Sequence, residues 1–135
     1  ISCTETRRKV EELLERCGLE KEYADRYPHQ VSGGQCQRAA IARALAVNPS
    51  ILICDEATSA LVVTVQKQIL ELLIELKKKE NLSFILICHD LALVQAFCDR
   101  VLVLYHGKTV ESGTPDETID HPQMDYTRKL IDSVL

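Results

Sequence analysis

The pattern of apolar and polar residues divides the chain into alternating helical and extended segments. Residues 4–17 and 63–79 carry apolar side chains on one face of an otherwise polar segment, which predicts amphipathic helices. A further helix is predicted at 37–47, where Asn48 and Pro49 end it. Short apolar runs predict three strands of the kind buried in a sheet, at 51–54, 83–88 and 101–105. This order predicts an α/β fold with a mainly parallel sheet and crossover helices.

Glycine and proline mark the breaks between these segments. Gly18 is expected to end the first helix, and Pro28 to stop a second short helix at 20–27. His106 and Gly107 predict a hairpin turn between the strand at 101–105 and a strand at 108–111. The tail is expected to be helical from Thr114, broken near Pro122, and helical again over 125–135.

Composition narrows the class of protein. The 135 residues are 46% apolar and carry a formal net charge of −4, which fits one soluble α/β domain and argues against a general nucleic-acid-binding surface. No apolar run approaches the ~20 residues needed to span a bilayer, and no signal peptide opens the chain. Because the chain starts at Ile1 rather than Met, we expect a fragment of a longer polypeptide.

The six cysteines are scattered, without the spacing of zinc ligands. Cys54 and Cys88 lie within apolar strand runs. They are therefore expected to be buried thiols in a reducing cytoplasm.

Two stretches carry candidate chemistry. Ser32, Gly33, Gly34 and Gln35 come where a loop becomes a helix, and small residues there leave backbone N–H groups open to an anion such as phosphate. Asp55 and Glu56 follow an apolar strand directly, at the end where open α/β sheets place their ligands.

These stretches resemble those of the ATP-binding-cassette (ABC) ATPases. Residues 31–35 are similar to the family's signature, commonly LSGGQ, and residues 51–56 to its Walker B strand. The resemblance implies a partial P-loop NTPase domain with part of a helical subdomain. Its expected parts are a helical and signature part, a sheet part and a helical tail, at 1–48, 49–113 and 114–135.

The resemblance also implies a role for each site residue. Asp55 would hold Mg²⁺, and Glu56 would polarise the attacking water as general base. His89, directly after a strand, matches the switch histidine that contacts the γ-phosphate. Ser32, Gly33, Gly34 and Gln35 would close over ATP held by a second nucleotide-binding domain, and the attached partners would be transmembrane permease subunits.

One family motif is missing from these residues. A phosphate-binding loop needs GxxxxGK[ST], and Gly107-Lys108-Thr109 matches only its end, because Leu102 stands where the first glycine is required. The resemblance therefore covers the C-terminal part of the nucleotide-binding domain. We expect that this chain alone neither binds ATP tightly nor hydrolyses it.

Three positions depart from the family's pattern. Ala57 stands where proline is usual and Cys36 where glutamine is common, and both changes are mild. Val62 replaces the aspartate that helps to join the two sites across the dimer, which puts cross-talk between those sites in doubt. Arg38 and Arg43 on the signature helix are either structural or close to that interface.

The sequence of the tail, with one stretch before it, indicates a group within the family. Pro122-Gln123 and the run 126–130, together with residues 89–92, resemble the dipeptide, oligopeptide and nickel importers, whose ATPase subunits lie at the cytoplasmic face of the cell membrane. Two alternatives stay open. One is a soluble ABC-type ATPase, which predicts a basic surface and long insertions that do not occur between Val31 and His89. The other is a non-catalytic interaction fragment.

Overall fold

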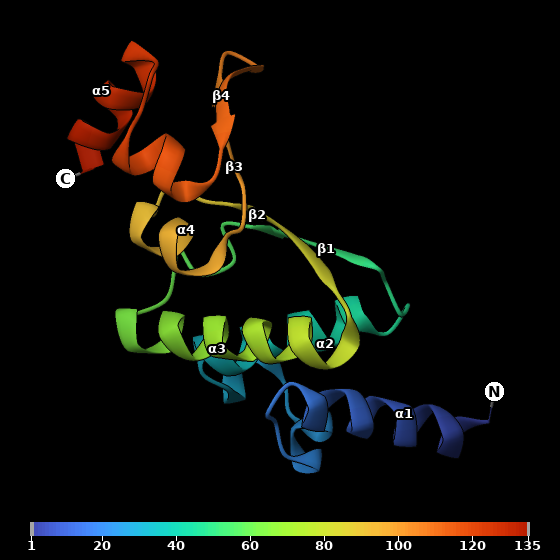
Figure 1. Cartoon of the computed structure of the whole chain (residues 1–135). Helices are drawn as coiled ribbons and strands as arrows, with labels where there is room; N and C mark the ends of the chain where they lie inside the picture. Colours follow the sequence, from blue (N-terminus) through green and yellow to red (C-terminus); the bar gives the residue numbers. More distant parts are fainter. Residues whose placement is uncertain (1, 135) are drawn as a thin grey trace. The chain divides into compact units, whose positions relative to one another are not determined.

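The structure, a computed structural model, describes residues 2–134 and divides into two compact units. The helical unit runs up to Ile85, and the hairpin unit starts at Leu86. Figure 1 shows the elements in chain order, from α1 near the N-terminus to α5 near the C-terminus. The predicted α/β class is confirmed.

The helical unit begins with α1 (Cys3–Arg16), whose amphipathic pattern predicted it. The Ser2 hydroxyl caps this helix by accepting a hydrogen bond from the backbone N–H of Glu5 at 3.2 Å. Gly18 follows the helix with a φ of 77°, in the left-handed conformation that ends many helices.

The segment after Gly18 is less helical than predicted. Two 3₁₀ turns, η1 (Lys21–Asp25) and η2 (Pro28–Gln30), take the place of one helix over 20–27. Arg26 and Tyr27 between them are extended, with ψ of 145° and 156°. For Tyr27 the cause is Pro28, because the residue before a proline is driven out of the helical region.

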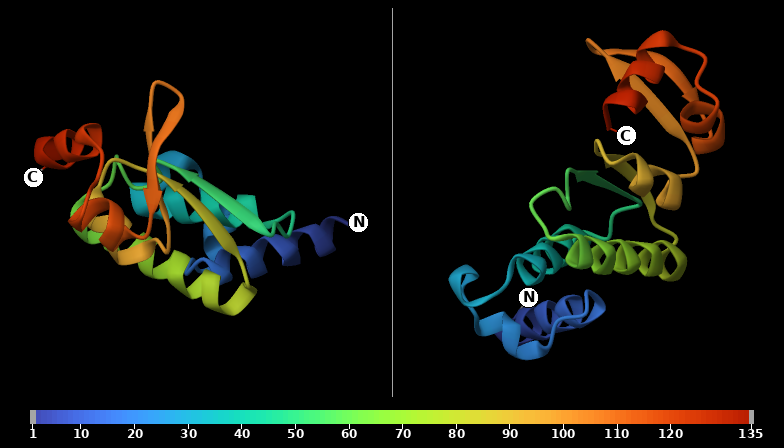
Figure 2. Two further views of the ribbon diagram at one scale, coloured as in Figure 1. Left: turned by 45° about the horizontal axis from the view of Figure 1, so that its top comes forward. Right: turned by 90° about the vertical axis from the view of Figure 1, so that its left-hand side faces the viewer.

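Helices α2 (Gly33–Leu45) and α3 (Val63–Glu80) form the centre of the helical unit. Figure 1 and the right-hand view of Figure 2 show them between strand β1 (Ile51–Asp55) and α1. The predicted inner face of α3 is confirmed at Ile69, Leu72, Leu73 and Leu76, all buried, whereas Val65 is half-buried. Strand β2 (Ser83–Ile87) pairs with β1, and α3 is the crossover between them, as a parallel pair requires.

The two paired strands leave one apolar face uncovered. Leu52 and Cys54 on β1 are buried, but Ile51 and Ile53 are 56% and 63% exposed. On β2, Ile85 and Ile87 are about half exposed. The prediction of fully buried strands is therefore wrong for this face. Cys88 follows the end of β2 and is half-buried rather than buried.

The hairpin unit contains α4 (Leu91–Phe97), the antiparallel strands β3 (Val101–Tyr105) and β4 (Lys108–Gly113), and a helical tail. His106 and Gly107 both have positive φ, 48° and 75°, as a tight hairpin turn demands. The predicted hairpin is confirmed, so Gly107-Lys108-Thr109 does not lie between a strand and a helix.

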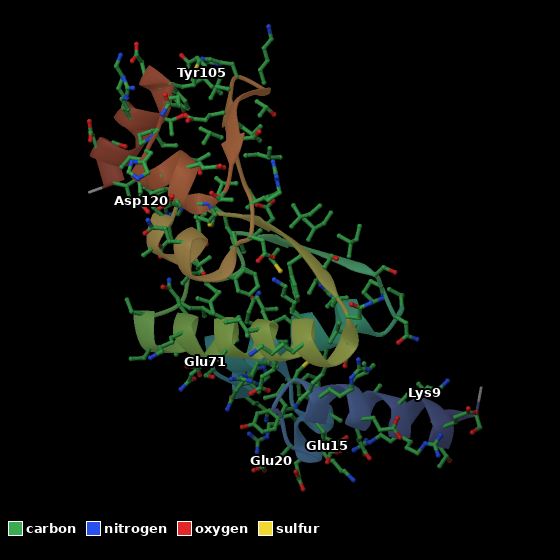
Figure 3. The ribbon with its side chains drawn as sticks, viewed as in Figure 1. Lys9, Glu15, Glu20, Glu71, Tyr105 and Asp120 are labelled. Carbon is green, nitrogen blue, oxygen red and sulfur yellow. The ribbon has the colours of Figure 1, made fainter. Side chains whose placement is uncertain are left out.

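The tail folds as a π-helical turn, η3 (Asp116–Asp120), followed by α5 (Asp125–Val134). Figure 3 labels Tyr105 and Asp120, which join this tail to the rest of the hairpin unit. The rings of Tyr105 and Tyr126 pack with centroids 4.3 Å apart, and the Gln95 amide donates to Asp120 at 2.9 Å. Within residues 2–134, no helix combines the length and apolarity needed to cross a membrane.

Candidate functional site

The stretch Ser32–Gln35 forms the N-terminus of α2. The Ser32 hydroxyl accepts from the Gln35 backbone N–H at 3.2 Å, and the Gln35 side-chain oxygen accepts from the Ser32 N–H at 2.9 Å. This reciprocal capping box fixes the helix start. The Gln35 amide nitrogen also donates to the Tyr23 hydroxyl at 2.7 Å, which ties η1 to the same point. Ser32 and Gly33 remain exposed to solvent.

The two glycines are needed for packing as well as for open amides. A β-carbon on Gly34 would lie 2.5 Å from Cγ1 of Val65, a distance that packed carbon atoms do not tolerate. A β-carbon on Gly33 would lie 3.3 Å from Cδ2 of Leu61, which is tight but not prohibitive. The start of α2 therefore sits directly against the start of α3. The sequence analysis missed this reason for Gly34, because nothing local to 31–35 refers to Val65.

Asp55 and Glu56 lie at the C-terminal end of β1, as predicted, and both are exposed. Glu56 has a φ of 47°, a left-handed conformation that is uncommon for a residue with a β-carbon. Its carbonyl accepts from the Ser59 backbone N–H at 3.1 Å and from the Ser59 hydroxyl at 3.0 Å. These two bonds hold a conformation that costs free energy, as is often seen at functional sites.

The turn after Glu56 is held from α3 by a residue that the sequence analysis did not single out. The Thr58 carbonyl accepts from the Leu61 N–H at 3.1 Å and from the Gln66 side-chain amide at 2.8 Å. The signal for Gln66 was present but weak. It is a polar residue three positions before Ile69, half-buried on the apolar side of a helix.

Arg38 has a structural role in this unit. Its guanidinium donates to the Cys17 carbonyl at 2.8 Å, just after the end of α1. A β-carbon on Gly18 would lie 2.6 Å from the same guanidinium nitrogen. Burial raises the pKa of the neighbouring Cys17 thiol to about 11 and keeps it protonated.

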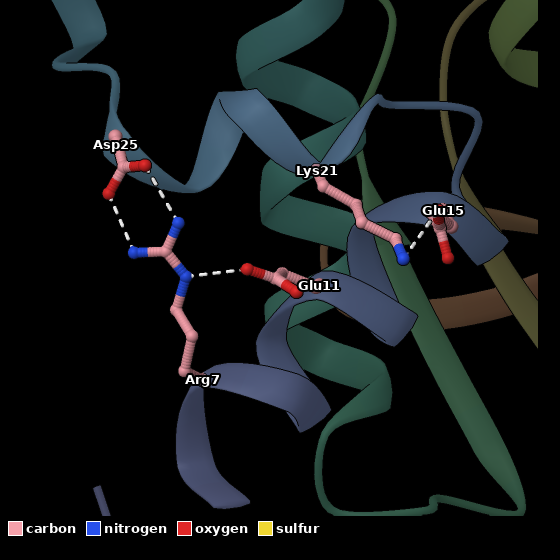
Figure 4. A network of polar contacts seen from close by, with 5 residues as sticks. All are labelled: Arg7, Glu11, Glu15, Lys21 and Asp25. Atoms are coloured by element: carbon pink, nitrogen blue, oxygen red, sulfur yellow. Dashed lines mark hydrogen bonds and ion pairs between the residues drawn. The ribbon is translucent and has the colours of Figure 1, made fainter. Parts of the chain in front are cut away.

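The surface of the helical unit carries a polar network that joins α1 to η1 (Figure 4). Arg7 binds both carboxylate oxygens of Asp25 at 2.7 Å and donates to Glu11 at 2.6 Å. The Arg7 guanidinium holds the pKa of the Asp25 carboxyl below its usual range. Farther along α1, Arg16 forms an ion pair with Glu80 at the end of α3.

His89 belongs to the hairpin unit and follows β2 directly. It is exposed, and the next residue, Asp90, caps α4 by accepting from the Leu93 N–H at 3.2 Å. A capped helix directly behind His89 fixes the backbone on its C-terminal side. The structure thus brings the serine, glycines and glutamine of 32–35 together with the turn after Glu56 through α3, and it places His89 beside α4.

Asp55 fits the chemistry of a magnesium ligand. Its carboxylate is exposed at the end of a strand, and Mg²⁺ is usually bound by one or two carboxylates together with substrate phosphates and water. In the part of the chain that the structure describes, no group of three histidine, cysteine or acidic side chains gathers as a metal site.

Comparison with known proteins finds relatives of this chain. The ABC transporter family profile matches residues 3–59. The oligopeptide transport ATP-binding protein OppF of Bacillus subtilis is 48% identical over 130 residues, which are 96% of this chain and 43% of that protein.

Two solved structures show the same fold. The cbiO1 structure from Clostridium perfringens, part of the cbiONQ transporter complex, has a TM-score of 0.78 at 34% identity, covering 90% of this chain and 48% of that one. The cassette MJ0796, solved as a dimer with ADP and Pi, has a TM-score of 0.71 at 35% identity, covering 85% of this chain and 49% of that one.

The chain therefore spans less than half the length of these relatives. Both the glycine pair and the acidic pair occur at the element ends where the family resemblance requires them, and almost the entire chain aligns with ATP-binding subunits. We conclude that the chain contains part of an ABC transporter family domain, matched at residues 3–59, and is similar to ATP-binding transport subunits over almost its entire length.

Proposed function

We propose that these residues are the C-terminal part of a nucleotide-binding domain whose whole protein hydrolyses ATP to drive an importer, for peptides or nickel. The observation that carries the proposal is that two motifs contact the same helix turn. Gly34 at the start of α2 and the turn after Glu56 both contact the first turn of α3. Peptide import is favoured because OppF, which aligns with 96% of this chain, is an oligopeptide transport protein.

Each site residue has a proposed role. Asp55 holds Mg²⁺ and Glu56 acts as general base on the attacking water. His89 contacts the γ-phosphate. The exposure of all three side chains supports these roles. The metal ion, when bound, neutralises charge that develops on the phosphates.

The signature residues face a second domain in this proposal. Ser32, Gly33, Gly34 and Gln35 close over ATP held by the partner domain, as either an identical chain or a sister subunit. The exposed positions of Ser32 and Gly33 support this contact, and the dimeric state of the related MJ0796 cassette agrees with it. The remaining partners are permease subunits, with the protein peripheral at the cytoplasmic face of the membrane.

We propose further that these residues alone do not hydrolyse ATP. Two observations support this. Gly107-Lys108-Thr109 lies in a hairpin, and the apolar face at Ile51, Ile53 and Ile85 is uncovered. An apolar sheet face of this kind normally packs against further structure, and this chain aligns with less than half the length of its relatives.

Two measurements test the proposal. In the whole protein, Glu56→Gln removes the base while keeping the side-chain size, so kcat for ATP hydrolysis is expected to fall by about 10²–10⁴-fold with ATP binding retained. Unchanged hydrolysis would contradict the assignment of Glu56. For the 135 residues alone, titration with ATP is expected to give no saturable binding in the micromolar range, and micromolar affinity would refute the fragment interpretation.

A further inference from the structure

The first turn of α3 contacts both predicted site stretches of the helical unit. On one side, Val65 lies against Gly34, and its methyl group fills the space that a β-carbon on Gly34 would need, while Leu61, in the turn before α3, lies near Gly33. On the other side, the Gln66 amide donates to the Thr58 carbonyl at 2.8 Å. Val65 and Gln66 are adjacent residues. A shift of the first turn of α3 therefore changes two contacts at once: the packing of Val65 on Gly34 and the hydrogen bond from Gln66 to Thr58.

The turn after Glu56 connects the bond between Gln66 and Thr58 to the backbone of Glu56. The Glu56 carbonyl accepts two bonds from Ser59, and Ser59 follows Thr58, whose carbonyl Gln66 holds. Because Glu56 is left-handed, its backbone needs such restraint to stay where it is. Each link in this path is a hydrogen bond of ordinary length, 2.8 to 3.1 Å.

We propose that Gln66 is a positioning residue: it fixes the turn that follows Glu56 and, through its neighbour Val65, couples that turn to the glycine pair. This role rests on the proposed ATPase function. Gln66 itself touches no reacting atom in this scheme. It acts by keeping the Glu56 backbone in the left-handed conformation while α2 stays seated on α3.

A purely structural role of Gln66 predicts different results. If Gln66 merely satisfies a buried carbonyl, its loss lowers stability and leaves the turn's local opening and the turnover of the folded protein unchanged. The matched control is Gln95→Met. It is the same chemical change, and it removes a hydrogen bond of 2.9 Å that the Gln95 side-chain amide donates to Asp120. It lies in the hairpin unit.

Amide hydrogen exchange on this chain is the first test. In Gln66→Met, the Ser59 and Leu61 N–H groups, which close the turn, are expected to exchange about tenfold faster, the change that loss of one hydrogen bond typically produces. The Gln35 N–H, at the glycine pair, is expected to accelerate as well. Exchange at Ser59 and Leu61 that stays as in Gln95→Met overturns the role of Gln66.

Turnover in the whole protein is the second test. Gln66→Met is expected to lower kcat for ATP hydrolysis about tenfold with KM unchanged. Gln66→Lys, which keeps an N–H donor of similar reach, is expected to restore most of it. A kcat equal to that of Gln95→Met overturns the proposal. A parent protein with no ATPase activity overturns the proposed function itself, whereas unaltered exchange in the turn overturns only the role of Gln66.

Discussion

The helical unit and the hairpin unit hold their candidate site residues in different ways. In the helical unit, apolar side chains from α2 and α3 interlock: Leu45, Ile69 and Leu73 are at most 1% exposed. In the hairpin unit, the most deeply buried side chains are the threonines Thr118 and Thr127. Apolar packing thus positions the glycine pair and the turn after Glu56, whereas the tail is held by polar contacts together with the packing of Tyr105 on Tyr126.

Two carboxylates of the hairpin unit, Glu111 and Glu117, accept hydrogen bonds from backbone N–H groups near the tail. Glu111 on β4 accepts from the backbone N–H groups of Gln123 and Met124, at 2.8 and 3.2 Å, just before α5. Glu117, within η3, accepts from the Thr114 N–H at 2.8 Å. The backbone N–H groups hold the pKa of both carboxyls below their usual range. The hairpin unit should therefore respond to pH, and the helical unit to side-chain volume.

The largest expected effect is a cavity in the helical unit. Leu73→Ala removes a fully buried side chain from the inner face of α3, so the free energy of unfolding should fall by ~3 kcal/mol. Urea denaturation followed by circular dichroism measures the loss. The matched control is Leu104→Ala on β3, where the side chain is 60% exposed and the expected change is within about 0.5 kcal/mol. Equal losses in the two variants would contradict the contrast between the units.

The next effect separates the two glycines of the signature. In Gly34→Ala, the new methyl group meets Val65 at 2.5 Å, and overpacking of this kind costs ~1–3 kcal/mol. The gain in helix propensity from glycine to alanine, at most ~1 kcal/mol, does not offset it. Gly33→Ala meets Leu61 at 3.3 Å and is expected to be near neutral.

Thermal unfolding of both glycine variants measures the difference. Adding Val65→Ala to Gly34→Ala should recover part of the stability that Gly34→Ala loses, because it removes the clashing methyl groups. If Gly33→Ala proves the more damaging change, the packing of α2 on α3 is not what the glycine pair serves.

Much of the fold could be predicted because burial follows periodicity within single elements. The buried positions of α3 recur at helical spacing, and the hairpin turn depends on two adjacent residues, His106 and Gly107. The bare face of β1 could not be predicted. The run from Ile51 to Cys54 is uniformly apolar and carries no alternation that would mark one side as uncovered.

The types of residue at the site could be predicted from the sequence, but the contacts that hold them in place could not. The sequence indicated an anion-binding helix start and a carboxylate pair at a strand end. The left-handed Glu56, the contact of Gly34 with Val65 and the bond from Gln66 to Thr58 all depend on how the first turn of α3 packs. Such contacts join residues that are far apart in sequence or carry no local motif, so they emerge only from the folded unit.

A smaller effect is expected when the pH is lowered, on the stability of the hairpin unit. The folded pKa of Glu111 lies below its ordinary value of 4.5, so its contribution to stability is fully present above that pH and is lost as the pH falls through the lower, folded value. As the pH falls below 4.5, the protection factors of the amides at the start of α5, which are corrected for the pH dependence of intrinsic exchange, should decrease. Glu111→Gln should flatten this pH dependence, while Asp116→Asn, at an exposed position, should leave it unchanged.

The smallest effect tests whether the helical unit also depends on a polar contact, the pairing of Arg7 with Asp25. Both side chains are largely solvent-exposed, so water and salt weaken their attraction. Arg7→Met keeps an unbranched side chain and removes the charge. It should loosen η1, seen as faster exchange of the Tyr23 and Arg26 amides, with little change in the melting temperature. In the parent, added 1 M NaCl should shift those amides toward the Arg7→Met rates, whereas Arg8→Met, on the same helix, should not alter them. A large drop in melting temperature would mean that this surface network, rather than the apolar contact between α2 and α3, holds the helical unit together.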